Sequence, residues 1–248
     1  MNVRAWIIGL LVVVGVGQAT ASAHMRDYLV NRYYYTAKRN EVELELWNDV
    51  NFSEADNDDS YNSTHQIELE YGVTDHVQLA YYEVYTWNRA KDWERDAFKI
   101  EAKARFAEAG QWPVDVALYT EYENPDGSRA VRSDVLENKV IVSQDVGNWN
   151  IVGNFTFEKP LNSGEPWVYE YTAGVSYAVT PTARLGLEIM EGLGTSDTFG
   201  DLRSQELQLI PGFYANLTPN IRVLVGPAFG LTRSTDDFQL KSLVEYEF

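Results

Sequence analysis

The last residues of the chain, 238–248, alternate between apolar and polar side chains, which predicts a β-strand whose two faces meet different surroundings. Leu243 alone interrupts the polar face, and the chain stops on the apolar residue Phe248. A closed membrane barrel needs a last strand of this kind, because its backbone must pair with the first strand where lipid offers no hydrogen bonds. The ending therefore favours a closed membrane barrel.

Similar alternation recurs along the chain and predicts twelve strands, an even number that brings both ends of a barrel to one side. The expected strands are about 40–48, 64–72, 76–87, 97–107, 113–123, 135–145, 149–158, 167–179, 183–191, 205–217, 220–231 and 238–248. Long polar connections alternate with tight turns such as Val73–Asp75. The sequence thus predicts an all-β, twelve-stranded antiparallel transmembrane β-barrel with short periplasmic turns and longer extracellular loops.

Two alternatives compete with this architecture. Residues 99–109 taken alone favour a helix, but the alternating segments on both sides make us predict a strand there. A soluble sandwich or lipocalin-like barrel also alternates, with its apolar face turned inward. We prefer the membrane barrel because of Phe248 and because the strands have the length of about 9–11 residues that a tilted membrane strand needs. In addition, nearly every strand carries charged residues on the face opposite its apolar one. Glu83, on an apolar face, is not explained by this pattern.

The first residues predict export from the cytoplasm. Arg4 precedes an apolar run, Ile7–Val16, and the small residues Ala21–Ala23 form a cleavage site, so residues 1–23 are expected to be a signal peptide. We expect residues 24–39 to be an N-terminal periplasmic segment and residues 40–248 to be the barrel. The chain contains no cysteine, so sheet closure and packing must stabilise it.

The chain ending resembles the C-terminal assembly signal of bacterial outer-membrane barrels, with Tyr246 and Phe248 at alternate final positions and Leu243 where a glycine is frequent. Together with the Gly72–Asp75 type of turn, the mature chain is similar to Gram-negative outer-membrane β-barrel proteins. It is loosely similar to the outer-membrane family described as MetA-pathway phenol-degradation or transporter-like proteins. The resemblance implies an outer-membrane location, contact with membrane lipids, lipopolysaccharide and the barrel assembly machinery, and passage of small solutes.

The formal charge of −17 argues against a nucleic-acid partner, whose phosphates demand clusters of Lys and Arg. If the apolar faces meet lipid, the charged faces line the lumen, where acids outnumber bases and would favour cations. We therefore predict an outer-membrane pore or transporter for small solutes or ions, a porin-like function. The candidate lumen-lining residues are Glu43, Glu45, Glu68, Glu70, Lys99, Glu101, Lys103, Arg105, Glu121, Lys139, Glu188, Arg222, Lys241 and Glu245.

The same charges support a second hypothesis, a plugged interior in which acids and bases of neighbouring strands pair and little passes. The barrel would then be structural, or it would serve adhesion through loops such as Trp87–Trp93.

We expect no catalytic residue, cofactor or resident metal. Ser63 and His65 form a Ser-x-His pair, but the sequence shows neither a motif nor an orienting partner around them, so a hydrolase is the weaker alternative. The acidic stretch 53–60 lacks the Gly and Glu spacing of a calcium helix-loop-helix site and is interpreted as a solvated loop. His24 would become the new amino terminus, and no third copper ligand is evident beside it.

Overall fold

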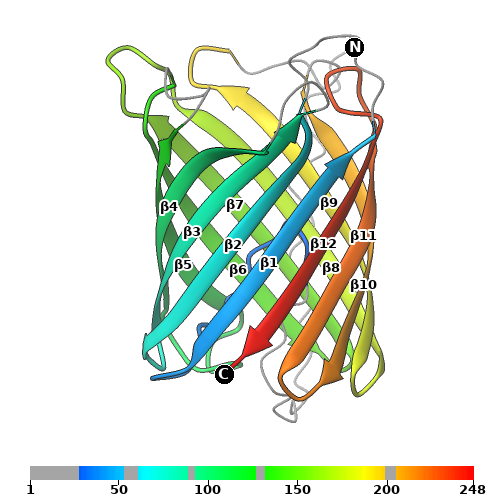
Figure 1. Ribbon diagram of the computed structural model, residues 1–248. Coiled ribbons are helices and arrows are strands. Elements are labelled where there is room, and N and C mark those ends of the chain that lie inside the picture. Colours follow the sequence, from blue (N-terminus) through cyan, green and yellow to red (C-terminus); the bar gives the residue numbers. More distant parts are fainter. Residues whose placement is uncertain (1–27, 53–60, 89–92, 127–131, 199–204) are drawn as a thin grey trace, which may run out of the picture.

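The computed structural model describes residues 28–52, 61–88, 93–126, 132–198 and 205–248, which form a closed antiparallel β-barrel of twelve strands (Figure 1). The strands are β1 (Val42–Asn51), β2 (Tyr61–Thr74), β3 (Val77–Asn88), β4 (Trp93–Arg105), β5 (Asp115–Pro125), β6 (Val135–Val146), β7 (Trp149–Pro160), β8 (Val168–Thr180), β9 (Ala183–Thr195), β10 (Leu207–Thr218), β11 (Ile221–Gly230) and β12 (Phe238–Glu247). Within these described ranges, no helix has both the length and the apolar character to cross a membrane.

The barrel closes where the last strand meets the first, as the ending predicted. Tyr246 of β12 lies opposite Leu44 of β1, and the backbone N–H of Phe248 donates a 3.0 Å hydrogen bond to the carbonyl of Val42. Because β12 also pairs with β11, neither of its edges is left open.

The barrel is apolar on the outside and polar on the inside, the reverse of a soluble barrel. In β2, Ile67 and Leu69 are 45% and 49% exposed, whereas Glu68 and Glu70 are 0% and 3% exposed. A wall of this kind suits acyl chains and excludes the sandwich and lipocalin-like alternatives, whose apolar faces would be buried. The prediction of a transmembrane barrel is therefore confirmed.

Some strands extend further toward the long connections than the alternation predicted, whereas β8, β10 and β11 stop one or two residues short of it. β2 begins at Tyr61, and β9 continues to Thr195. The helical alternative for residues 99–109 is wrong, because β4 pairs with both β3 and β5 over residues 99–104 and those ladders satisfy its backbone, while residues 106–109 follow the strand without a helix. Most connections at the end of the barrel where the C-terminus lies are tight turns, and the longer ones gather at the opposite end (Figure 1).

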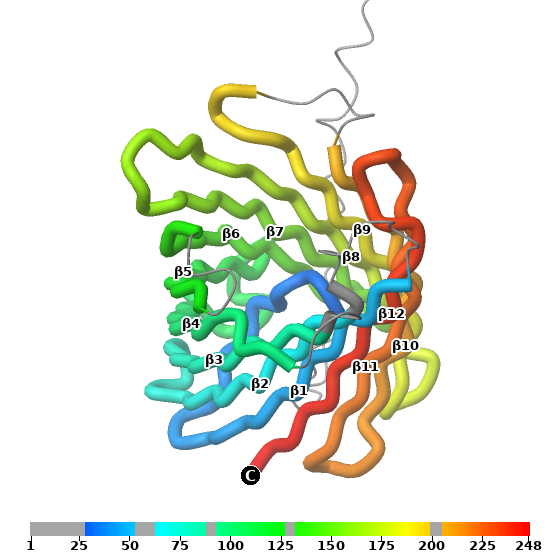
Figure 2. Tube along the Cα trace, turned by 45° about the horizontal axis from the view of Figure 1, so that its top comes forward, coloured from blue at the N-terminus to red at the C-terminus, as the bar shows by residue number. Residues whose placement is uncertain are grey.

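A segment outside the strands, residues 28–37, lies inside the barrel, where the two views show it looping between the walls (Figures 1 and 2). We call it the N-terminal plug. It packs on an apolar area of the inner wall that includes Leu224 and Leu243, both fully buried. Leu243 interrupts the polar face of the last strand for this reason.

Glu83, the polar residue on an apolar outer face, has a local partner. The Nε of Arg95 in β4 donates a 2.6 Å hydrogen bond to its carboxylate. Arg95 also contacts Asp126, next to a long connection, so it bridges Glu83 in the middle of β3 to the end of β5.

Candidate functional site

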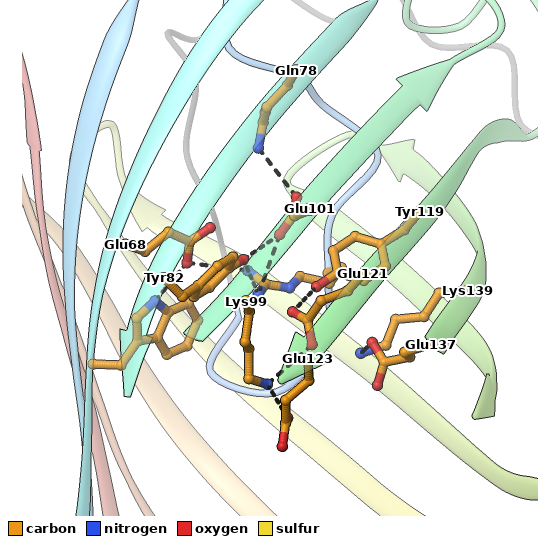
Figure 3. A network of polar contacts seen from close by, with 12 residues as sticks. Glu68, Gln78, Tyr82, Lys99, Glu101, Tyr119, Glu121, Glu123, Glu137 and Lys139 are labelled. Atoms are coloured by element: carbon orange, nitrogen blue, oxygen red, sulfur yellow. Dashed lines mark hydrogen bonds and ion pairs between the residues drawn. The ribbon is translucent and has the colours of Figure 1, made fainter. Parts of the chain in front are cut away.

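The fourteen charged residues that the sequence assigned to the lumen lie on inward faces of their strands. Twelve are at most 9% exposed, and the side chains of Lys99 and Lys139 are 20% and 14% exposed. The strands bring them together from both halves of the chain, and opposite charges pair across the wall. Lys99 lies 3.0 Å from Glu121 and 3.2 Å from Glu123. Figure 3 shows this group beside Glu137 and Lys139, which are 2.7 Å apart.

Carboxylates from β1, β2 and β4 gather on the inner face of the wall that these strands form together with β3. Oxygens of Glu43, Glu45 and Glu70, and likewise of Glu68, Glu70 and Glu101, lie within 4.8 Å of one another. Hard oxygen ligands of this kind suit Ca²⁺ or Mg²⁺. Cationic side chains stand among them, however, since Lys103 and Arg222 line a cavity of about 30 Å³ together with Glu43, Glu45 and Glu70. We therefore assign no metal to this cluster.

Glu188 of β9 holds the N-terminal plug through a set of converging donors. Its carboxylate accepts hydrogen bonds from the backbone N–H groups of Leu29 (2.6 Å), Val30 (2.9 Å) and Asn31 (3.0 Å). The amide of Asn31 and the hydroxyl of Tyr214 donate as well, at 2.9 and 2.8 Å. Five donors on one fully buried carboxylate stabilise its charge and fix the position of three consecutive plug residues.

Arg32 carries a positive charge from the plug into the acidic wall. Its guanidinium donates a 2.6 Å hydrogen bond to the hydroxyl of Tyr82 and lies 3.8 Å from Glu68 and 3.7 Å from Glu101. Figure 3 shows these three wall residues turned toward one another, and Tyr82 also donates to Glu101. The rings of Trp47, Tyr82 and Tyr119 surround the guanidinium at 5.4–5.7 Å, within cation–π range.

Two wall glycines make room for plug side chains. A Cβ at Gly174 would lie 2.6 Å from the ring of Tyr28, and one at Gly226 would lie 2.7 Å from Cδ1 of Leu29 and 2.6 Å from the wall carbonyl of Pro211. These distances are too short for any larger residue without a shift. At the end of the plug, the backbone N–H of Ala37 donates a 2.8 Å hydrogen bond to the side-chain oxygen of Gln78, and the chain then leaves the interior.

The plug corrects one expectation. We expected residues 24–39 to lie outside the barrel in the periplasm, but residues 28–37 pack within it. Residues 24–27 and the signal peptide lie outside the described residues, as do His24 and the acidic stretch 53–60. A signal for the plug was present in Arg32 and the run Tyr33–Tyr35, which is more cationic and aromatic than a solvated linker requires.

Near the end of the barrel that carries the longer connections, the inner wall borders a cavity of about 470 Å³. We call it the upper vestibule. Its polar lining contains one base, Lys241, which lies 2.8 Å from Asp49. The lining residues are Asp49, Asn51, Ser63, Thr64, Met190, Glu206, Gln208, Asp236, Gln239 and Lys241.

Ser63 and His65 have an orienting partner that the sequence did not show. The Nε2 of His65 lies 2.9 Å from the Oγ of Ser63, and its Nδ1 lies 2.7 Å from the Oδ1 of Asn48. Asn48 stands directly opposite His65 in the ladder between β1 and β2. The statement that this pair lacks a third group is therefore wrong, because the pairing register supplies one from the neighbouring strand.

The fold is similar to that of solved outer-membrane channels. The COG4313 outer membrane channel from Pseudomonas putida F1 superposes with a TM-score of 0.63 at 10% identity, covering 87% of this chain and 98% of that one. The KdgM porin, solved in complex with disordered oligogalacturonate, and the NanC porin each give a TM-score of 0.56, at 10% and 11% identity. They cover 83% of this chain and 99% and 98% of their own.

No protein-family model and no curated protein sequence matches the chain. At these identities, the structural likeness establishes a shared porin and channel fold. Membership of the phenol-degradation family stays a prediction.

Proposed function

We propose that this protein is an outer-membrane pore for passive passage of small solutes or ions, closed in the described state by the N-terminal plug. The observation that carries the proposal is the way the interior is filled. The walls form a complete ladder of their own, and the segment that occupies the bore is a separate piece of chain. Three outer-membrane channels and porins with the same fold support it.

The plug is held mainly by side chains of the wall and not by strand pairing. Glu188 and Gln78 accept its backbone N–H groups, and Asn154 both accepts from the N–H of Arg32 at 2.6 Å and donates to its carbonyl at 2.9 Å. If the plug withdrew, these wall groups would exchange its hydrogen bonds for hydrogen bonds to water, and no barrel ladder would break. Passage then requires movement of the plug alone.

The charge of the bore supports a preference for cations. Three acids and one base line the upper vestibule, and the carboxylates of β1, β2 and β4 lie further along the same interior. Removing Arg32 along with the plug would leave that wall more acidic still. Rings of acidic side chains favour cations in pores.

The location follows from the wall and the ending. The apolar outer face places the barrel in a membrane, and Tyr246 and Phe248 provide the ending that we interpret as the signal for the barrel assembly machinery. The partners are outer-membrane lipids, lipopolysaccharide and the small solutes that pass.

Currents across a planar bilayer test the pore. We expect brief, infrequent openings from the refolded wild-type protein and long openings from the double variant Glu188→Gln/Asn154→Ala, which removes two acceptors of the plug. Under a salt gradient, the reversal potential should favour cations. A double variant that keeps heat-modifiable gel mobility and yet stays silent would contradict the pore and leave the structural barrel, which the cross-wall ion pairs and the filled interior favour.

A further inference from the structure

Ser63, His65 and Asn48 form a directional chain of hydrogen bonds. The Oδ1 of Asn48 only accepts, so the Nδ1 of His65, 2.7 Å away, carries the ring proton. The Nε2 is then unprotonated and accepts the hydroxyl hydrogen of Ser63 at 2.9 Å. A hydroxyl, a base aimed at its proton and a group that fixes the tautomer of the base constitute the arrangement that activates a serine nucleophile.

The chain of hydrogen bonds lies on the outer face of the barrel. Ser63 and His65 lie on the same face of β2 as the exposed Ile67 and Leu69, and Asn48 lies on the same face of β1 as the exposed Leu46. Aromatic residues border them, since Trp87 stands opposite Ser63 and the Trp93 ring lies 4.5 Å from that of His65. Exposed Trp side chains of this kind mark the level of the lipid headgroups.

We propose that Ser63, His65 and Asn48 form an esterase site that acts on acyl esters of membrane lipids. At the headgroup level, the ester linkages of lipids lie beside the outer face of the wall. Ser63 also borders the upper vestibule, whereas His65 and Asn48 do not, and the esterase reaction does not require passage through the pore.

In the reaction, the Oγ of Ser63 bonds to the acyl carbonyl carbon and its proton passes to Nε2 of His65. The C–O bond to the alcohol then breaks, and the alcohol leaves with that proton. A water molecule, deprotonated by His65, attacks the acyl-serine, and Ser63 recovers its proton as the carboxylic acid departs. Asn48 is a positioning residue. We assign no oxyanion donor, so the first measurement reads covalent modification of the serine hydroxyl and not turnover of an ester.

Covalent labelling of the refolded barrel tests the proposal. A fluorophosphonate with a short alkyl group forms a Ser–O–P bond and releases fluoride, and its small size suits a serine that is 8% exposed. We expect peptide mapping to place the label on Ser63. Ser242 is the internal control, because it stands on the lipid-facing side of β12 opposite Asn48 and is more exposed than Ser63.

Variants separate an activated serine from a polar contact that only stabilises the wall. We expect His65→Phe to slow labelling by about 100-fold, the lower range for loss of a general base. Asn48→Leu should slow it as well, and Asn48→Asp should restore it, because a carboxylate holds the same tautomer. All variants must keep heat-modifiable gel mobility, which shows that the barrel is folded. The peptide map of the labelled wild-type protein does not depend on any variant. Labelling of wild type no faster than of Ser63→Ala, or a label found on Ser242, would overturn the esterase site and leave the pore proposal untouched.

Discussion

Glu188 accepts a hydrogen bond from the backbone N–H of Leu29 at 2.6 Å, although 159 residues separate them in the chain. The contact joins the first described residues to the ninth strand and places the plug across the bore. Because two further backbone N–H groups converge on the same carboxylate, this single side chain fixes the position of three consecutive plug residues.

The first prediction concerns this carboxylate. Glu188→Gln keeps the size of the side chain but removes its charge and replaces one acceptor oxygen by a donor, so three backbone N–H groups lose a charged partner. We expect the plug to loosen and openings in a bilayer to become longer. As a second readout, Leu29→Cys introduces the only thiol of the chain, and its maleimide labelling should accelerate about tenfold or more in the Glu188→Gln background. Glu191→Gln, the same change on the opposite face of β9, should leave both readouts unchanged.

The second prediction concerns the recess in the wall at Gly174. Gly174→Ala places a methyl group 2.6 Å from the ring of Tyr28, and such overpacking costs about 1–3 kcal/mol. We expect faster labelling of Leu29→Cys, and Tyr28→Leu should restore slow labelling in the alanine background by returning space. Gly153→Ala is the matched control, because its methyl group would meet nothing nearer than 3.6 Å. Equal labelling in the Gly174 and Gly153 variants would show that Tyr28 does not dock as described.

The third prediction concerns Arg32. Arg32→Met removes the cation near Glu68 and Glu101, two carboxylates at most 1% exposed, and should lower the free energy of unfolding by about 3–5 kcal/mol. Urea unfolding followed by Trp fluorescence measures it. Arg39→Met, at an exposed position, should change the midpoint little. If both variants unfold at the same urea concentration, the guanidinium does not stabilise the acidic wall.

The fourth prediction concerns ion preference. Neutralising the upper vestibule with Glu206→Gln and Asp236→Asn, in the plug-released background Glu188→Gln/Asn154→Ala, should move the reversal potential toward zero, because fewer carboxylates attract cations at the mouth. The shift should shrink as salt rises, since a Debye length of about 8 Å at physiological ionic strength already screens exposed charges. Asp197→Asn, an exposed residue that does not line the vestibule, is the control. A reversal potential that ignores the vestibule charges would place ion selection elsewhere in the bore.

Much of the fold was readable from local patterns. A period of two placed Ile67 and Leu69 on one face and Glu68 and Glu70 on the other, and the apolar ending at Phe248 indicated which face meets lipid. Strand limits were less accurate, as at Tyr61, because polar residues near the rim continue a ladder without continuing the apolar alternation.

The sequence by itself determined the number of strands, the closure of β12 on β1 and the inverted wall, because each depends on short-range alternation that every strand repeats. Only the tertiary structure decided that residues 28–37 fill the bore and that Asn48 meets His65. Glu188, Asn154 and Gly174 become partners of the plug through barrel closure, which brings together residues more than a hundred positions apart. Asn48 reaches His65 through strand register, and no local period records either relationship.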